Sequence, residues 1–346
     1  MGTQGKRESS AIVASALALL VLIAMLALAA CGGLSTTAAS SPSTAPSVTP
    51  RESATPLPVP TVAGTIAFCK VVKPVEGGDA DIYTVRPDGT RLTRLTESGG
   101  WEESPSWSPD GKKLAYARYA KGTISAMYAS VWVMNADGSG ERQLTSRSCC
   151  GPSWSPDGTM IAYMRAMWST RAHVFIMNAD GSGQRAVVRS MFVHYPVWTP
   201  DGRIVFEPDP PTGSGADTVL YAVNPDGSGR ERFFGDVYLG GYAVSPDGAS
   251  LAYDDPTADA MLVKPLQEGP EPVVVLEPVS AYVPDNFDGV PLAVAAWRPD
   301  GKVLVVASYN VHSLEGSPLY VVNADGTGLS AVPGIDRAMD PAWRPE

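Results

Sequence analysis

Histidine and cysteine are scarce in this chain of 346 residues, which contains three histidines and four cysteines. They form no Cys-x-x-Cys or His-Glu-x-x-His pattern, and the sequence has no Gly-x-Ser-x-Gly elbow and no glycine-rich phosphate loop. The chain therefore carries none of the common motifs for thiol redox chemistry, zinc hydrolysis, serine catalysis or nucleotide binding. We expect neither a cofactor nor a dedicated metal site.

Positive charge is also in short supply, with 26 Lys and Arg residues against 36 Asp and Glu residues and a net charge of −10. Cleavage after residue 30 would remove Lys6, Arg7 and Glu8 and leave a net charge of −11. An acidic domain without a basic stripe argues against binding to nucleic acid or to anionic lipid headgroups. It permits a cationic partner without requiring one.

The N-terminus has the features of an export signal. Two basic residues precede the apolar stretch Ala11–Ala30, which ends at Leu28-Ala-Ala-Cys31. This ending resembles the bacterial lipobox, so we predict a lipoprotein signal peptide over residues 1–30 and lipid on Cys31. Twenty apolar residues are also long enough for an uncleaved membrane anchor, which remains the alternative. Either interpretation predicts an extracytoplasmic protein tethered to the cell membrane.

Residues 31–61 are rich in Ser, Thr, Pro and Ala and contain few large apolar residues. Such a segment cannot bury enough apolar surface to offset the entropy of ordering it. We predict a disordered tether between the lipid and a folded domain over residues 62–346.

A short phrase of the form Trp-x-Pro-Asp-Gly recurs through the rest of the chain. Its copies begin at Trp107, Trp154, Trp198, Val244, Trp297 and Trp343, at intervals of 47, 44, 46, 53 and 46 residues. The fourth copy has valine in place of tryptophan, and the sixth breaks off after Pro345. A fixed period in the forties, built from short strands, is typical of a β-propeller with one four-stranded blade per repeat. The repeat therefore predicts an all-β fold.

Each repeat contains two further strands and a tight turn. The strand after each phrase is short and rich in β-branched and aromatic residues. These strands are expected at 113–116, 160–163, 203–206, 250–253 and 303–306. The next strand of a repeat is expected at 82–85, 131–134, 174–177, 220–223 and 319–322. Turns such as Asn135-Ala-Asp-Gly138 follow the partner strands, and we interpret them as structural turns rather than calcium loops.

The two ends of the domain each supply half of a repeat. Asp340–Pro345 predicts an inner strand with no second strand after it, whereas Gly64–Phe68 predicts a second strand with no inner strand before it. Together they complete one blade, so we predict six blades with the last one closed by the N- and C-terminal strands. The repeat that begins at Val244 is the most divergent.

The phrase Trp-Ser-Pro-Asp-Gly-Lys-Lys-Leu-Ala-Tyr and the phrase Val-Met-Asn-Ala-Asp-Gly together resemble the WD40-like repeats of TolB-type six-bladed propellers. The resemblance covers most of residues 62–346 and is specific for fold but not for function. TolB itself has an α/β domain before its propeller, for which this sequence leaves no room. Related peptidases carry a hydrolase domain after theirs, which this sequence does not contain.

Alignment of the repeats on their tryptophans predicts which side chains surround the mouth of the central channel. The polar and thiol-bearing residues three and four positions before each tryptophan are Glu103, Ser104, Cys150, His194, Tyr195 and Asp340. Six loops converge on such a mouth, which makes it the expected ligand-binding face. Longer loops carrying Tyr119, Trp168 and Tyr309 should open on the same face. The alternative is a solvated rim without function.

Three cysteines, Cys69, Cys149 and Cys150, lie inside the predicted propeller. In an oxidising compartment they allow three alternative disulfides, which pair Cys69 with either of the others or join the vicinal pair. Unmodified thiols are a further alternative. A metal site is disfavoured because no further ligands stand at a suitable spacing.

Two functions from different classes remain. The first is a monomeric binding or scaffold propeller that recognises a protein, peptide or glycan at the channel mouth. The second is a hydrolase or polysaccharide lyase that uses a metal or an acid–base pair at the same mouth. The short domain without a recognisable nucleophile favours the binding protein.

Overall fold

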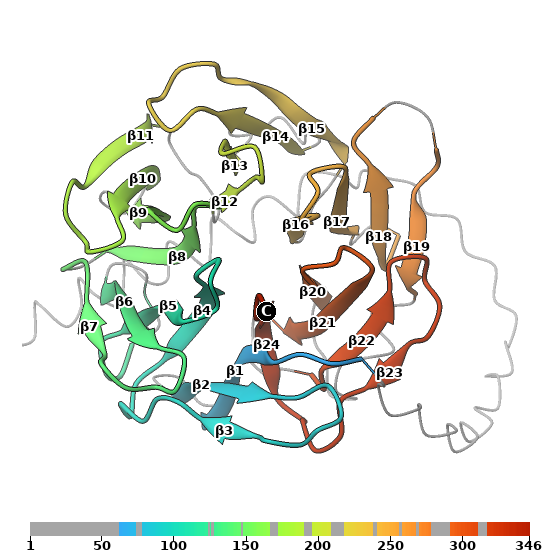
Figure 1. Ribbon diagram of the computed structural model, residues 1–346, viewed down its shortest axis with the longest axis horizontal. Coiled ribbons are helices and arrows are strands. Elements are labelled where there is room, and N and C mark those ends of the chain that lie inside the picture. The colour runs from blue at the N-terminus through green and yellow to red at the C-terminus, as the bar shows by residue number, and fades with distance from the viewer. Residues whose placement is uncertain are drawn as a thin grey trace, which may run out of the picture. The chain divides into compact units, whose positions relative to one another are not determined.

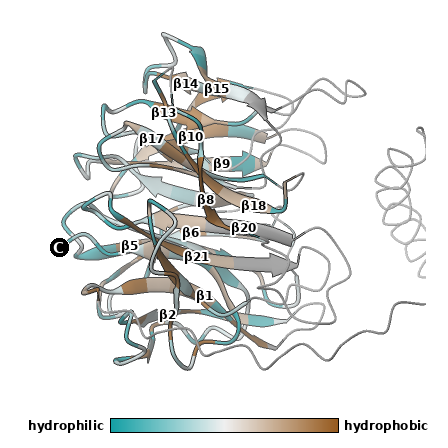
Figure 2. Ribbon diagram, turned by 90° about the vertical axis from the view of Figure 1, so that its right-hand side faces the viewer, coloured by the Kyte–Doolittle hydropathy of each residue, from teal (hydrophilic) through white to brown (hydrophobic). Residues whose placement is uncertain are grey.

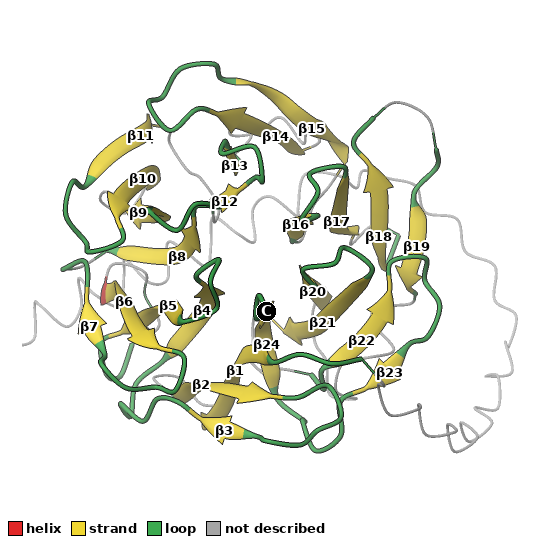
Figure 3. Cartoon of the chain, viewed as in Figure 1, coloured by secondary structure: helices red, strands yellow, loops and turns green. Residues whose placement is uncertain are grey.

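The computed structural model describes residues 62–73, 78–123, 125, 128–146, 148–166, 172–189, 196–208, 218–237, 241–255, 258–267, 270–277, 291–310 and 317–346. All of them belong to one compact unit of the chain, and strands dominate it (Figure 3). No helix within these residues is long and apolar enough to cross a membrane. The predicted signal peptide and tether lie outside the described residues.

The described strands form six antiparallel sheets of four strands each, arranged in a ring around a central axis (Figure 1). Blade 1 contains β4 (Glu102–Trp107), β5 (Lys113–Tyr119), β6 (Ala129–Asn135) and β7 (Arg142–Gln143). Blade 2 contains β8 (Cys149–Trp154), β9 (Met160–Ala166), β10 (Ala172–Asn178) and β11 (Arg185–Arg189). Blade 3 contains β12 (Val197–Trp198), β13 (Ile204–Phe206), β14 (Thr218–Val223) and β15 (Glu231–Val237).

Blade 4 contains β16 (Tyr242–Val244), β17 (Ser250–Asp255), β18 (Ala260–Pro265) and β19 (Val273–Leu276). Blade 5 contains β20 (Pro291–Trp297), β21 (Val303–Asn310), β22 (Tyr320–Asn323) and β23 (Ser330–Ala331). The closing blade contains β24 (Ala338–Trp343), β1 (Ile66–Lys73), β2 (Asp79–Val85) and β3 (Thr93–Arg94). The predicted six-bladed propeller is therefore confirmed, with strands close to the expected ranges.

The closing blade joins the two ends of the domain. β24 pairs with β1 in antiparallel register, with Ile66 opposite Trp343 and Cys69 opposite Met339. This pairing confirms that an N-terminal and a C-terminal strand complete the last blade. It also leaves the ring without a gap between its first and last blades.

The repeated tryptophans pack between neighbouring blades, as the sequence predicts. Trp107 is 7% exposed and lies in a core cluster with Ala67, Cys69 and Ile82 of the closing blade. Its indole N–H also donates to the carbonyl of Ala342 at 3.3 Å. The apolar residues concentrate on the strands (Figure 2), so much of the core consists of contacts between sheets.

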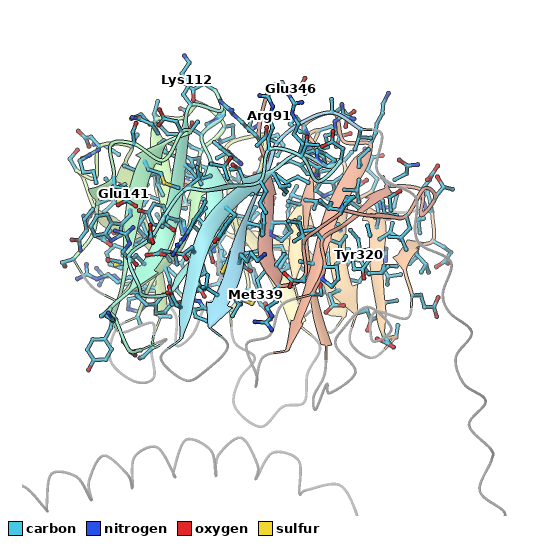
Figure 4. The ribbon with its side chains drawn as sticks, turned by 90° about the horizontal axis from the view of Figure 1, so that it is seen from below. Arg91, Lys112, Glu141, Tyr320, Met339 and Glu346 are labelled. Carbon is cyan, nitrogen blue, oxygen red and sulfur yellow. The ribbon has the colours of Figure 1, made fainter. Side chains whose placement is uncertain are left out.

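The two faces of the propeller differ. Arg91, Lys112 and Glu346 lie on one face, which carries the tight turns, whereas Met339 lies toward the other (Figure 4). We call the first the turn face and the second the mouth face, since the inner strands begin there. The turns are locally satisfied: Asp137 accepts bonds from the backbone N–H and the hydroxyl of Ser139, at 3.0 and 2.7 Å.

Candidate functional site

Three neighbouring inner strands share a backbone irregularity at the channel mouth. The register of β4 shifts between Glu103 and Ser106, and that of β8 shifts between Cys150 and Ser153. The register between β24 and β1 shifts in the same way, opposite residues 67–69. A β-bulge of this kind changes the direction of side chains and bends the strand. Among the described strands, the closing blade, blade 1 and blade 2 share this bulge, and we call their part of the mouth the bulged sector.

The residue three positions before the tryptophan has a positive φ in each bulged strand. The values are 54° for Ser104, 58° for Gly151 and 47° for Asp340. Serine and aspartate rarely occupy this left-handed region, and the conformation costs about 1 kcal/mol or more. A strained backbone that recurs at equivalent positions indicates that the bulge belongs to the architecture of these blades.

A proline marks each of the three bulges in the sequence. Pro105, Pro152 and Pro341 stand two residues before their tryptophans, where β20 of blade 5 has Ala295 and keeps an unbroken register. Proline has no N–H to donate to the ladder, so a regular strand is disfavoured at that position. This signal was available in the sequence, and our alignment of the mouth residues did not use it.

Glu103 lies half-buried on β4 and accepts two side-chain hydrogen bonds. The indole N–H of Trp101 donates to its Oε2 at 2.9 Å, and the hydroxyl of Tyr119 donates to its Oε1. Tyr119 and Trp101 are themselves buried. The Glu103 carboxylate is thus held in a defined orientation by two aromatic side chains.

Asp340 lies beside Glu103 but comes from the closing blade. Its Oδ2 accepts a hydrogen bond from the backbone N–H of Ser104 at 3.1 Å and a longer one from the Ser104 hydroxyl at 3.4 Å. Burial, and secondly the negative charge of Glu103, raises the pKa of Asp340 to about 7. The two carboxyl groups therefore interact across the boundary between blades, and Asp340 is poised to exchange a proton near neutral pH.

The cysteines near the mouth are thiols in the structure. Cys69, Cys149 and Cys150 are all buried, and the anticipated disulfide is not formed among them. Burial, and then the charges of Asp340 and Glu103, raises the pKa of the Cys69 thiol well above its usual value. Burial has the same effect on Cys150. Neither sulfur is suited to act as a thiolate nucleophile.

The structure brings together only part of the predicted ring. Glu103, Ser104 and Asp340 converge, and Cys150 is buried behind them in the same core cluster as Cys69. His194 and Tyr195 lie outside the described residues, so their predicted position at the mouth is untested. Within the described ranges, no group of three or more His, Cys, Asp or Glu side chains could hold a metal ion.

The turn face contains a hollow that the sequence analysis did not predict, since it treated these turns as structural only. A cavity of about 820 Å³ is lined by Val62, Ala63, Gly64, Thr65, Arg86, Pro87, Asp88, Asp110, Arg344, Pro345 and Glu346. Its lining comes from two turns and from both ends of the described propeller. Segments so far apart in the sequence come together only because the closing blade joins them.

Comparisons with known proteins agree with this architecture. Residues 70–237 match the family model described as the TolB beta propeller domain. Over 39 residues the chain is 59% identical to the protein TolB homolog of Chlorobium luteolum, and over 70 residues it is 39% identical to the Tol-Pal system protein TolB 1 of Novosphingobium aromaticivorans. These matches cover 11% and 20% of this chain but only 9% and 14% of the relatives.

Solved structures share the fold at low sequence identity. The crystal structure of TolB from Acinetobacter baumannii is similar with a TM-score of 0.62 and 19% identity, over 82% of this chain and 67% of that one. An oligogalacturonate lyase in complex with manganese is similar with a TM-score of 0.50 and 13% identity, over 70% of this chain and 71% of that one. The repeats, the six closed blades and the family match together show that this chain carries a TolB-like six-bladed β-propeller.

Proposed function

We propose that this protein is a membrane-tethered, extracytoplasmic propeller that binds a protein or peptide of the cell envelope at its channel mouth. The observation that carries the proposal is the bulged sector, where Glu103 and Asp340 from adjacent blades converge beside Ser104. The blades hold these groups in place, and preorganised polar groups favour ligand binding. Glycans remain a further ligand class for the same surface.

The names of the similar proteins support the envelope assignment. One of them is a Tol-Pal system protein, and the family model describes a TolB propeller. The sequence of residues 1–31 supports export and lipid attachment at Cys31. We therefore infer a lipoprotein whose propeller is displayed outside the cytoplasm, and we propose that it is a monomer.

The attachment point of the tether favours the mouth as the binding face. Val62 to Thr65 line the hollow on the turn face, directly before β1. Val62, directly after the predicted tether, therefore lies on the turn face, and the mouth lies at the opposite end of the inner strands.

Site-specific photo-crosslinking tests the binding face. A photoreactive amino acid at Ser104 should capture a discrete partner in cells, whereas the same amino acid at Lys112 on the turn face should not. The double variant Glu103→Gln with Asp340→Asn should reduce the captured adduct at least about tenfold, as expected for the loss of charge-assisted contacts. Glu271→Gln, at an exposed site away from the mouth, is the matched control.

His194 and Tyr195 belong to the proposed surface as well. The change His194→Ala with Tyr195→Ala should weaken capture at Ser104 and leave the melting temperature within a few degrees. Strong capture at Lys112 that depends on the turn residue Asn135 would contradict the proposal, because the binding face would then be the turn face.

A second candidate function, acid–base hydrolysis or elimination of a polysaccharide, is favoured by one observation. A carboxyl group with a pKa of about 7 at the channel mouth is matched to proton transfer near neutral pH. If the protein is such an enzyme, purified propeller should cleave an acidic polysaccharide and Asp340→Asn should abolish the cleavage. Absence of turnover on a broad panel would leave the binding function.

A further inference from the structure

Two carboxyl groups are fully buried where the closing blade packs against blade 1. Asp81 lies on β2 and Glu102 lies on β4, and both are 0% exposed. The backbone holds the two strands together at this point, since the N–H of Ala80 donates to the carbonyl of Gly100 at 3.1 Å. The carboxyl groups therefore meet at a fixed contact between blades.

Each carboxyl group has an arginine partner from its own blade. Arg94 donates two hydrogen bonds to Oδ2 of Asp81, at 3.0 and 2.6 Å. Arg118 donates through Nε to Oε1 of Glu102 at 2.8 Å, and the hydroxyls of Thr96 and Ser98 also donate to this carboxyl group. Both groups are thus partly compensated, and both remain hidden from water.

One buried oxygen at this contact lacks a donor. Oδ1 of Asp81 accepts no hydrogen bond from any described residue, although the Glu102 carboxyl group lies within hydrogen-bonding reach of Asp81. An unsatisfied buried oxygen costs about 1 to 3 kcal/mol. A proton between the two carboxyl groups would supply the missing hydrogen bond and remove their mutual repulsion.

The surrounding charges do not compensate for two buried carboxylates. The acidic and basic groups around the pair are Asp79, Glu97, Glu103, Glu141, Arg94 and Arg118, with the thiol of Cys69 and the phenols of Tyr83 and Tyr116 nearby. Glu97 also forms an ion pair with Arg94 at 3.1 Å, and Glu141 forms one with Arg118 at 2.5 Å. Two arginines therefore face six carboxyl groups in total.

Burial is the first cause that raises the pKa of both groups. It raises the pKa of Asp81, against the opposing effect of Arg94, and it raises the pKa of Glu102 to about 7, against Ser98 and Arg118. Two strongly interacting acids lose their protons in steps that belong to the pair. The last proton held by the pair is therefore lost near neutral pH.

We propose that Asp81 and Glu102 share one proton at neutral pH, and that this proton tightens the contact between the closing blade and blade 1 as the pH falls. The direction follows from linkage, because the folded state holds the proton at a pH where the unfolded chain has released it. The resulting stability is fully present below about pH 4.5 and is lost as the pH rises through about 7. The contact between the closing blade and blade 1 is thus the part of the ring that this pair stabilises as the pH falls from about 7.

Carboxyl carbon NMR of the unliganded protein tests the shared proton directly. The resonance of Glu102 should titrate near pH 7, and in Asp81→Asn its midpoint should fall by about one pH unit or more as the charge repulsion disappears. The variant Asp340→Asn is the control, since it should leave the Glu102 midpoint near pH 7. Titration of Glu102 at the ordinary value near 4.5 would overturn the proposal.

Thermal unfolding tests the consequence for the ring. The wild-type melting temperature should fall between about pH 5.5 and about pH 8, and the double variant Asp81→Asn with Glu102→Gln should lose part of that slope, the remainder coming from Asp340. An unchanged slope in the double variant would overturn the proposed role of the pair. If the double variant does not fold, the wild-type NMR titration decides alone. Neither measurement requires a ligand, so both are independent of the proposed binding function.

Discussion

Ser104 and Asp340 adopt backbone conformations that favour glycine, and they contact each other across two blades. Aspartate tolerates the left-handed region better than most residues because its short polar side chain can bond locally. Here the Asp340 carboxyl group instead accepts from the backbone of the neighbouring blade. The strain at each residue is thus coupled to a contact between blades, which is a common arrangement at functional sites.

Asp340→Asn should reduce the loss of thermal stability as the pH rises above neutral. The pKa of Asp340 is raised to about 7 in the folded state, above its unfolded value, so its contribution to stability is lost as the pH rises through about 7. Asparagine cannot ionise and still offers an oxygen to the Ser104 N–H. At about pH 8 the variant should melt a few degrees above wild type, and near pH 5 the two should converge.

The control for this prediction is Asp157→Asn in an exposed turn. Hydrogen bonds from Ser155 and Thr159 hold the pKa of Asp157 below its usual range, so its stabilising effect is present at neutral pH and lost only in acid. This variant should be destabilised equally at pH 5 and pH 8. A pH-independent effect of Asp340→Asn would show that its carboxyl group does not titrate in this range.

At the scale of the strand and turn, the blades depend on glycines that touch their neighbours. Gly326 has a φ of 81° at the turn after β22, and a Cβ there would lie 2.4 Å from the carbonyl oxygen of Val274 in blade 4. A Cβ at Gly138 would likewise lie 3.0 Å from the carbonyl oxygen of Leu95 in the closing blade. The repeated Asp-Gly turns are therefore contacts between blades as well as chain reversals.

Gly326→Ala should destabilise the propeller more than Gly202→Ala. Gly202 has a nearly identical φ of 83°, but a Cβ there would have no atom within 4 Å. The control should lose about 1 to 2 kcal/mol from backbone strain alone. Gly326→Ala should lose about 1 to 3 kcal/mol more, because the turn must move away from blade 4. Denaturant unfolding measures the free energy of unfolding of both variants. Equal losses would show that the contact with blade 4 adjusts to the added Cβ without further cost.

The repeat made the blades predictable, since Trp107 and its counterparts recur with a turn signal and a β-rich run at a fixed spacing. The mouth was predictable only in part. Alignment placed Glu103 and Asp340 on one ring, but their interaction depends on the bulges. The prolines two residues before the tryptophans mark these bulges, and the sequence analysis did not use them. Asp81 and Glu102 follow no period, so only the packing of neighbouring blades reveals that they meet. The cysteines gave no unique pairing, because chain order does not fix the distance between sulfurs.

At the scale of the whole molecule, the ring is held closed by one strand pair. Deletion of residues 340–346 removes most of β24, including Trp343, which is 5% exposed and packs in the core with Ile66 and Phe68. Loss of a buried tryptophan side chain alone costs about 3 to 5 kcal/mol. The deletion also exposes the edge of β1, so we expect a strongly lowered melting temperature or aggregation.

Deletion of residues 344–346 alone is the control for this prediction. It keeps Trp343 and removes Arg344, whose Nε donates to the carbonyl of Gly111 at 2.8 Å. The backbone N–H of Arg344 also donates to the carbonyl of Thr65, and its guanidinium lies over the ring of Trp107. This shorter truncation should cost about 2 to 3 kcal/mol, as for two hydrogen bonds and one cation–π contact. If the longer deletion melts within a few degrees of the shorter one, β24 does not close the ring in the way that its pairing indicates.

The proposed tether would decide where a closed ring of this kind acts. If Cys31 carries lipid as proposed, Cys31→Ser should abolish incorporation of a labelled fatty acid and leave an uncut precursor, because processing at Leu28-Ala-Ala-Cys31 would then require the modified cysteine. Two acyl chains on one residue anchor a protein durably, whereas a single chain binds only marginally. Ser35→Ala, four residues farther along the tether, should be labelled and processed normally. Mature-sized protein in Cys31→Ser would mean that an ordinary signal peptidase acts here. The propeller would then be released from the membrane, and its mouth would have to find its partner by diffusion.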